Sequence, residues 1–187
     1  MEIIKLESKD LALSAVFASL YAATVILQGL TAAAAIQLRV ADCLIPLAAL
    51  FGPPSIIGVS VGCFFCNAYL SASMQYGVFD ILLGPLANLI AATIIFKLRR
   101  NVLLGCTIGS LVIGLIVGGY LWLLFPPPDN VFGLMLPGFL PAWFLSILSI
   151  TISSLVALCI FGYTLLKVMS RPGILKPLRT RGLKVYI

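Results

Sequence analysis

Residues 78–100 read VFDILLGPLANLIAATIIFKLRR, a nearly unbroken apolar run with one acid near its start and three bases at its end. An α-helix needs about 20 apolar residues to cross the hydrocarbon core of a bilayer, and this run supplies them. Lys97, Arg99 and Arg100 mark one end, and Asp80 marks the other. Because lysine and arginine gather on the cytoplasmic side of membrane proteins, the stretch predicts a transmembrane helix with its basic end in the cytoplasm.

The whole chain has the composition of a membrane protein. Of its 187 residues 61% are hydrophobic and only 10% are charged, whereas a soluble domain carries about 25% charged residues. The net charge of +6 comes from bases at the ends of apolar runs, which indicates membrane orientation rather than nucleic-acid binding. The apolar runs are continuous instead of alternating, which argues against a β-barrel. We therefore predict an all-α, multi-pass protein of the cytoplasmic membrane.

Three groups of basic residues determine the predicted number of spans. One group precedes the first apolar run (Lys5 and Lys9), one follows residue 96, and one contains six bases between residues 167 and 184. If all three groups are cytoplasmic, an even number of helices separates neighbouring groups. We predict six transmembrane helices with both the N and the C terminus in the cytoplasm, at about residues 11–30, 36–52, 54–71, 78–98, 102–125 and 139–168. A single domain then covers residues 1–170, followed by a basic cytoplasmic tail, residues 171–187.

Several predicted helices carry small residues at four-residue spacing, which lets helix backbones approach closely in lipid. Such pairs are Gly58 with Gly62, Gly105 with Gly109, and Gly114 with Gly118. We interpret them as packing sites within the chain. The first helix has two stripes of the same kind, formed by Ser14, Ala15, Ala18, Ser19, Ala22 and Ala23. Cys63 and Cys66 are spaced as a C-x-x-C, but they stand in an apolar run and are interpreted as small packing residues.

Two charged residues stand among apolar runs near the predicted outer end of the second helix. Arg39 and Asp42 are three residues apart, so on a helix they share one face and can partly neutralise each other. Either charge costs about 2.5–3.5 kcal/mol at the centre of a transmembrane helix, and less near the interface. Two interpretations stay open at this point: a structural ion pair at the outer surface, or a pair that lines a substrate cavity.

The fourth predicted helix adds polar groups on the same side of the membrane. Asp80, Gly84 and Asn88 are four residues apart, so they lie on one helix face over about 12 Å. The carboxylate of Asp80 at the rim, the missing side chain at Gly84 and the amide of Asn88 at the floor would together suit a flat polar ligand. Gln37 and Asn67 can face the same space. Interhelical hydrogen bonds are the alternative explanation for Asn67 and Asn88.

Aromatic side chains also gather at the predicted outer level: Tyr69, Tyr76, Tyr120, Trp122 and Trp143. They are typical of an aromatic belt at the membrane interface, and one or two of them can instead stack on a ligand ring. The chain contains no histidine and none of the motifs of hydrolases, metalloenzymes or nucleotide-binding loops. We therefore expect no catalytic residues, no metal site and no cofactor. ATP-driven transport would then require partner subunits.

Two stretches, IQLRVADCLIPLAALFGPPSIIGVSVGCFFCNAYLS (residues 36–71) and YGVFDILLGPLANLIAATI (residues 76–94), resemble the QueT family. This family comprises substrate-binding S components of energy-coupling factor (ECF) transporters that are linked to queuosine precursors. The resemblance covers about residues 11–100. The matching positions are Gln37, Arg39, Asp42, Gly58, Gly62, Asn67, Asp80 and Gly84. Leu38 and Asp42 depart mildly from the family pattern, which more often has an aromatic residue and a glutamate there.

The resemblance implies a six-helix bundle like that of S components, in a complex with a transmembrane coupling subunit and two ATPase subunits. S components often contact the coupling subunit through small residues four apart on their first helix. The two stripes from Ser14 to Ala23 suit this role, and ordinary helix packing is the alternative.

The resemblance also implies a cationic deazapurine substrate, such as queuine or preQ1, a deazaguanine with an aminomethyl group. The predicted outer side agrees in charge, because one base against three acids gives 1 − 3 = −2. We expect Asp80, or else Asp42, to pair with the ammonium group. Arg39 would bind the purine carbonyl or orient Asp42, while Asn67 and Asn88 would read the base edges. The alternative functions are transport of another small vitamin or nucleobase, and a structural membrane protein without a ligand.

Overall fold

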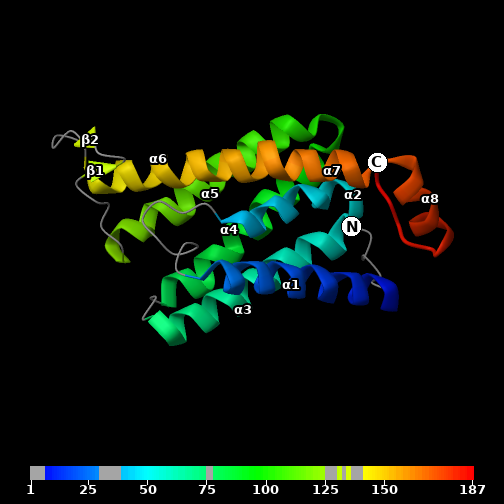
Figure 1. Ribbon diagram of the computed structural model, residues 1–187, viewed down its shortest axis with the longest axis horizontal. Coiled ribbons are helices and arrows are strands. Elements are labelled where there is room, and N and C mark those ends of the chain that lie inside the picture. The colour runs from blue at the N-terminus through cyan, green and yellow to red at the C-terminus, as the bar shows by residue number, and fades with distance from the viewer. Residues whose placement is uncertain (1–6, 30–38, 75–77, 125–129, 132–133, 136–140) are drawn as a thin grey trace.

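The computed structural model describes residues 7–29, 39–74, 78–124, 130–131, 134–135 and 141–187. Most of this part is helical, and the long helices run side by side along the molecule (Figure 1). The first four long helices are α1 (Ser8–Gln28), α3 (Pro53–Met74), α4 (Val78–Lys97) and α5 (Val102–Leu124). The last span is built from α6 (Ala142–Leu155), the π-helical segment η4 (Val156–Gly162) and α7 (Tyr163–Met169).

Short elements mark the two ends of the bundle. Between α5 and α6 the described residues form an antiparallel pair of short strands, β1 (Asn130–Val131) and β2 (Leu134–Met135). At the opposite end η3 (Arg99–Asn101) joins α4 to α5, and α8 (Pro172–Thr180) follows α7 (Figure 1). The bases of α4, η3, α7 and α8 all lie at this second end. The positive-inside rule therefore makes it the cytoplasmic end.

The prediction of an all-α, multi-pass membrane protein is confirmed. Among the described residues, five helices are long and apolar enough to cross a membrane: Ser8–Gln28, Pro53–Ala72, Val78–Lys97, Arg99–Leu124 and Ala142–Met169. A sixth apolar helix, Val40–Phe51, is shorter. The six-helix arrangement expected from the sequence thus consists of five long helices and one short one.

The short helix differs from the predicted span over residues 36–52. Its described part begins as the 3-10 helix η2 (Val40–Leu47) and ends as α2 (Ala48–Phe51), while residues 36–38 lie outside the described residues. Pro46 has no N–H to donate to the preceding turn, which removes one α-helical hydrogen bond where the winding is tighter. At rises of about 2.0 and 1.5 Å per residue the two segments cover roughly 22 Å, less than the hydrocarbon core.

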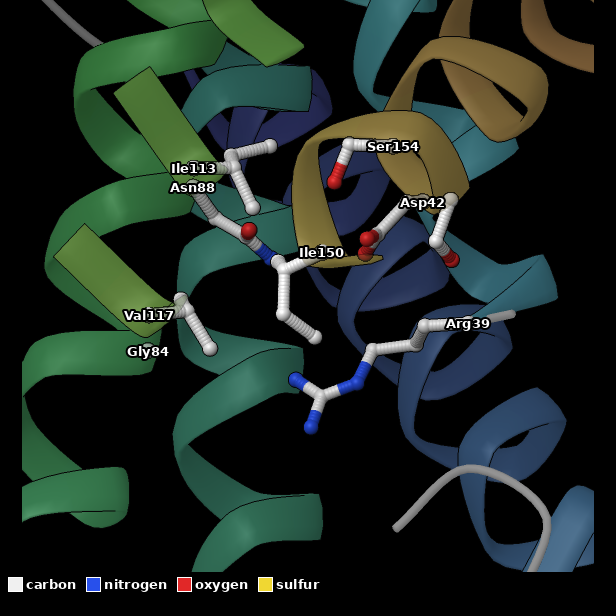
Figure 2. A pocket seen from close by; sticks show the side chains of 9 residues that line it. Arg39, Asp42, Gly84, Asn88, Ile113, Val117, Ile150 and Ser154 are labelled. Carbon is white, nitrogen blue, oxygen red and sulfur yellow. The ribbon is translucent and has the colours of Figure 1, made fainter. Parts of the chain in front are cut away.

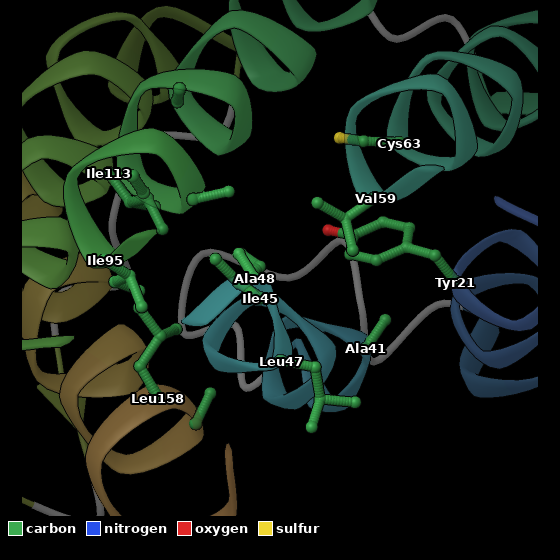
Figure 3. Packing of buried hydrophobic residues seen from close by; sticks show 14 of the residues in the cluster. Tyr21, Ala41, Ile45, Leu47, Ala48, Val59, Cys63, Ile95, Ile113 and Leu158 are labelled. Carbon is green, nitrogen blue, oxygen red and sulfur yellow. The ribbon is translucent and has the colours of Figure 1, made fainter. Parts of the chain in front are cut away.

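This short helix lies at the centre of the bundle. It contacts α1, α3, α4, η4 and α7, and most of its side chains are buried. Figure 3 shows Ile45 and Ala48 between Tyr21 and Val59 on one side and Ile95 on the other. Its first turn carries the charged residues of the predicted site, so the packing around it decides where those charges lie.

Glycines bring the helices close together, as their spacing predicts. A Cβ at Gly62 of α3 would lie 2.6 Å from the carbonyl oxygen of Ala18 in α1. A Cβ at Gly118 of α5 would lie 2.5 Å from the Cα of Ile147 in α6, and Gly105 faces α4 in the same way. The interpretation of these glycines as packing sites within the chain is confirmed.

The predicted basic tail is folded against the cytoplasmic end of the bundle. After α8 the chain returns to the central helix, where the N–H of Tyr186 donates to the carbonyl of Leu50. The ring of Tyr186 packs edge-on against Phe96, with 5.1 Å between the ring centroids. Lys184 forms a salt bridge of 2.8 Å with Glu7, the residue before α1. These contacts tie the last residues of the chain to α1, α2 and α4.

Candidate functional site

A small cavity lies beside η2, between α4, α5 and α6 (Figure 2). It holds about 330 Å³ of space outside the atoms, part of which is open to the surroundings. The polar side chains of its wall are Arg39, Asp42, Asn88, Ser153 and Ser154. The rest of the wall is apolar or without a side chain: Gly84, Ile113, Val117 and Ile150. The cavity therefore combines charged groups from the first half of the chain with an apolar surface from α5 and α6.

Arg39 and Asp42 both line this cavity, but they do not form the ion pair that their spacing suggests. Within the described part of the chain, the only salt bridge joins Lys184 to Glu7 at the cytoplasmic end. Arg39 precedes the first residue of η2 and has φ −80° and ψ 93°, so its extended backbone does not continue the helical face of Asp42. In Figure 2 the guanidinium points away from the Asp42 carboxylate. Both charges thus belong to the cavity wall without neutralising each other directly.

The carboxylate of Asp42 is held by Tyr21 instead. Tyr21 of α1 is fully buried, and its hydroxyl donates a hydrogen bond of 2.5 Å to Oδ1 of Asp42. The same hydroxyl oxygen accepts a hydrogen bond of 2.9 Å from Nδ2 of Asn88 in α4. One tyrosine therefore links α1, η2 and α4 at the wall of the cavity.

Sequence reasoning missed Tyr21, although the sequence contains a signal for it. Tyrosines of an aromatic belt lie near the ends of transmembrane helices, whereas Tyr21 lies well inside the 21-residue helix α1. A buried tyrosine hydroxyl needs a partner, so a tyrosine at this depth indicates a polar group on a neighbouring helix. The apolar wall residues Ile113, Val117 and Ile150 carry no such signal, because large apolar side chains occur on every face of α5 and α6.

Asp80 lies in a second polar cluster, which is separate from the described cavity wall. Its side chain is 2% exposed, and its Oδ1 accepts a hydrogen bond of 2.6 Å from the hydroxyl of Tyr120 in α5. Nδ2 of Asn67 in α3 donates a hydrogen bond of 2.8 Å to the backbone carbonyl of Asp80. Gly84 makes this possible, because a Cβ there would lie 2.5 Å from that amide nitrogen. Asn67 therefore forms an interhelical hydrogen bond, the alternative that the sequence left open.

The predicted stripe of α4 is only partly turned toward the cavity. Asp80, Gly84 and Asn88 share one buried face, as their spacing predicts. Gly84 and Asn88 are among the residues of the cavity wall, and Asp80 is not. Gln37, which we also expect to face this space, lies outside the described residues.

The predicted outer aromatic residues divide between two environments. Tyr120 is 7% exposed and bonded to a carboxylate, so it does not belong to a belt at the membrane surface. Tyr69 and Trp143 are about half exposed, as belt residues are, and Tyr76 lies outside the described residues. None of the described residues that line the cavity is aromatic. Stacking of an aromatic side chain on a ligand therefore stays a prediction.

The guanidinium of Arg39 has few hydrogen-bond partners in the described structure. Nη1 donates to Sγ of Cys63 at 3.8 Å, and the same sulfur accepts from Nδ2 of Asn67 at 3.6 Å. Nε of Arg39 is buried and has no hydrogen-bond partner in the described structure. A buried donor left unpaired costs about 1–3 kcal/mol, so an acceptor supplied by a ligand would stabilise this arrangement.

The buried charges of the cavity wall and of the Asp80 cluster together do not balance. Arg39 and Asp42 of the wall cancel, and the buried Asp80 adds one negative charge, so the total is 1 − 2 = −1 if all three groups are ionised. Charges inside a membrane protein pair with one another or with a transported ligand. A cationic group bound in this region would neutralise the remaining charge. In the described residues no three His, Cys, Asp or Glu side chains are placed to hold a metal ion.

The small residues of α1 fall on two different faces. Ser14 and Ala18 pack against Gly58 and Gly62 of α3, and Ala22 is half-buried. Ordinary helix packing thus explains the first stripe. The second stripe is exposed and consists of Ala15, Ser19 and Ala23. Only this second stripe is free to contact a partner subunit or lipid.

Comparison with known proteins gives one match. The family model described as QueT transporter matches residues 11–171, which is most of the chain. Neither a curated protein nor a solved structure matches. The family match extends well beyond the first 100 residues, so it includes α5 and α6, which supply the apolar part of the cavity wall.

Proposed function

Because the chain belongs to the QueT transporter family, we propose that it is the substrate-binding membrane subunit of an energy-coupling factor transporter for a queuosine precursor. Family membership makes it a multi-pass transport protein rather than an enzyme. The observation that carries the finer assignment is the cavity beside η2. Its wall contains Asp42 and Arg39, whose Nε has no partner among the described residues.

The chemistry of this wall suits preQ1, which carries a protonated aminomethyl group and a purine-like ring with a carbonyl. Asp42 pairs with the ammonium group, and Arg39 donates to the carbonyl; such charge-assisted hydrogen bonds are stronger than neutral ones. Asn88 binds an edge of the ring. We favour Asp42 over Asp80 as the partner of the ammonium group. Each aspartate has one carboxylate oxygen bonded to a tyrosine, but Asp42 is among the residues that line the cavity and Asp80 is not.

The apolar part of the wall suits the faces of the ring. Ile113 and Val117 project from α5, and Ile150 projects from α6 (Figure 2). Ligand pockets usually combine an apolar lining with a few polar groups that fix orientation. The wall of this cavity has both.

The exposed face of α1 supports the proposed partner. Ala15, Ser19 and Ala23 leave a flat strip on which another helix can pack closely. The sequence contains no phosphate-binding loop with lysine, so the energy for uptake comes from two ATPase subunits through a transmembrane coupling subunit. The strip on α1 is where we place the contact with that coupling subunit.

Titration of the purified protein in lipid nanodiscs with preQ1, by isothermal titration calorimetry, tests the proposal. We expect sub-micromolar binding. The variants Asp42→Asn and Arg39→Ala should each weaken it about tenfold or more, because a hydrogen bond to a charged group contributes about 1.5–3 kcal/mol. The matched control is Glu7→Gln, which removes an exposed carboxylate at the cytoplasmic end and should bind like the wild type.

Three outcomes would change the assignment. Unchanged binding in both cavity variants would place the ligand elsewhere. Binding of a different vitamin or nucleobase in place of every deazapurine would keep the transport subunit and change its substrate. A protein that binds none of these compounds would support a structural role.

A further inference from the structure

Asp42 has two potential partners in the cavity region, and it is bonded to only one of them. The hydroxyl of Tyr21 donates to Oδ1 of Asp42 at 2.5 Å. No salt bridge joins Arg39 to Asp42 in the described structure, although both side chains line the same small cavity. Opposite charges that line one cavity attract each other, so loss of the bond to Tyr21 would leave the carboxylate free to turn toward the guanidinium.

The position of Tyr21 is set by helix packing and not by the cavity. Tyr21 is fully buried, and a Cβ at Gly62 of α3 would lie 2.8 Å from the Cβ of Tyr21. The backbones of α1 and α3 are therefore in close contact at this point, so the phenol ring has little room to move. Its hydroxyl is a fixed group to which mobile polar side chains can bind.

The hydroxyl of Tyr21 also sets the orientation of Asn88. A side-chain amide has a donor end and an acceptor end. Nδ2 of Asn88 donates to the Tyr21 oxygen at 2.9 Å, which leaves Oδ1 as the end available to a ligand. Asp42 has a second carboxylate oxygen, Oδ2, besides the one that accepts from Tyr21. The wall thus offers acceptors at Asp42 and Asn88, and donors at Arg39.

We propose that Tyr21 is a positioning residue of the substrate site, whose hydroxyl keeps Asp42 from pairing with Arg39 and keeps the amide oxygen of Asn88 toward the ligand. A ligand with donor groups on one side and an acceptor on the other, such as an amine-bearing purine analogue, matches this pattern. The identity of that ligand rests on the proposed function. The prevention of the ion pair does not, because it concerns side chains of the chain itself.

The same protein contains a matched control. Tyr120 is also buried, and its hydroxyl also donates to an aspartate, Asp80, at 2.6 Å. Neither Tyr120 nor Asp80 is among the residues of the described cavity wall. Tyr21→Phe and Tyr120→Phe therefore each remove a buried hydroxyl that donates to an aspartate. Only the hydroxyl of Tyr21 is bonded to residues of the described cavity wall, Asp42 and Asn88. A purely structural role predicts that neither change distinguishes between ligands.

Binding of two compounds to both variants separates these roles. The compounds are preQ1 and deazaguanine without the aminomethyl group, titrated into protein in nanodiscs. We expect Tyr21→Phe to weaken preQ1 binding about tenfold and to weaken binding of the amine-free compound distinctly less. Tyr120→Phe should change both affinities less than about threefold. Equal losses for both compounds in Tyr21→Phe, or equal losses in both variants, would overturn the positioning role.

A double-mutant cycle tests whether Tyr21 acts through Asp42. If it acts mainly through Asp42, Tyr21→Phe should have a much smaller further effect on preQ1 binding in a protein that already carries Asp42→Asn. Fully additive losses would overturn the part of the inference that concerns Asp42 and leave only the bond to Asn88.

A ligand-free structure of Tyr21→Phe tests the ion pair directly and does not depend on the proposed substrate. We expect a nitrogen of Arg39 to lie within about 4 Å of a carboxylate oxygen of Asp42. An Asp42 side chain that stays in place, apart from Arg39, would overturn this part of the inference. If the wild type binds no deazapurine while this structure shows the new ion pair, the proposed substrate fails and the positioning role of Tyr21 stands.

Discussion

The backbone N–H of Tyr186 donates a hydrogen bond of 2.9 Å to the carbonyl oxygen of Leu50, which attaches the end of the chain to the inner end of the short central helix. The other end of that helix carries Asp42 in the cavity wall. The tyrosine ring closes the contact, since a Cβ at Gly52 would lie 2.6 Å from it. One element of twelve residues, Val40–Phe51, thus runs from the cytoplasmic end of the bundle to the candidate site.

Loss of the Tyr186 ring should destabilise the cytoplasmic end. Tyr186→Ala removes the edge-on contact with Phe96, whose ring centroid is 5.1 Å away, together with the packing over Gly52. We expect the free energy of unfolding to fall by about 1–2 kcal/mol, from the aromatic pair and the lost apolar burial. Thermal unfolding in detergent measures this as a lower Tm. Ile187→Ala, at the adjacent exposed position, is the control, and an equal Tm for the two variants would contradict the prediction.

Close packing of α1 on α3 should not tolerate a methyl group at Gly62. A Cβ there would meet the carbonyl oxygen of Ala18 at 2.6 Å, so Gly62→Ala forces the helices apart and should cost about 1–3 kcal/mol. Gly119→Ala is the control, because a Cβ at Gly119 has no atom within 4 Å. Thermal unfolding of both variants checks the difference. A Gly62→Ala protein as stable as the control would show that the two helices can separate freely.

The salt bridge between Lys184 and Glu7 should give a small stability difference that depends on pH. The hydrogen bond and the charge of Glu7 raise the pKa of Lys184 above its usual 10.5. A raised pKa in the folded state means that the contribution is fully present below pH 10.5 and is lost as the pH rises through the folded value. Wild type and Lys184→Ala should therefore differ slightly in Tm at neutral pH and converge in strongly alkaline buffer.

Salt provides a second check on the same pair, since screening weakens exposed charges. The Tm difference between wild type and Lys184→Ala should shrink at high ionic strength. A difference that is unchanged by both pH and salt would assign the effect to packing of the lysine chain.

The two buried aspartates should respond differently to loss of charge. Asp42→Asn changes a residue of the cavity wall, whereas Asp80→Asn changes one whose Oδ1 is bonded to Tyr120 away from that wall. We expect Asp80→Asn to lower stability and to weaken preQ1 binding less than about threefold, while Asp42→Asn weakens it about tenfold or more. Calorimetry on both variants decides the matter. Loss of binding in Asp80→Asn alone would restore Asp80 as the ligand partner that the sequence favoured.

A bulky residue on the exposed strip of α1 should separate uptake from binding. Ser19→Trp places a large ring where the coupling subunit is proposed to pack, at a position exposed on the outside of the bundle. We expect uptake by cells that contain all subunits to fall strongly, and calorimetric binding by the isolated protein to stay unchanged. Leu115→Trp, on the exposed side of α5, is the control. Normal uptake by Ser19→Trp would move the interface away from α1.

Much of the fold follows from the sequence, because the features that specify it are local. The number of spans and their orientation follow from apolar runs of bilayer length and from the bases at their ends. The glycine pairs indicate close contacts, since a missing side chain is needed wherever backbones meet. The period of an α-helix also places Asp80, Gly84 and Asn88 on one buried face. The sequence pattern alone identifies Arg39 and Asp42 as charges that need an explanation.

Only the tertiary structure decides which partners these polar groups take. Tyr21 is 21 residues from Asp42 and 67 residues from Asn88 in the chain, and such bonds depend on how far each helix is rotated in the bundle. The tight 3-10 start of the central helix, with Arg39 outside it, separates two charges that an α-helix would pair. The apolar part of the wall cannot be read from the sequence, because large apolar side chains occur on every face of α5 and α6. The sequence therefore determines which polar groups enter the membrane. Helix packing determines their partners: Asp42 is bonded to Tyr21, and the buried Nε of Arg39 has no partner in the described structure.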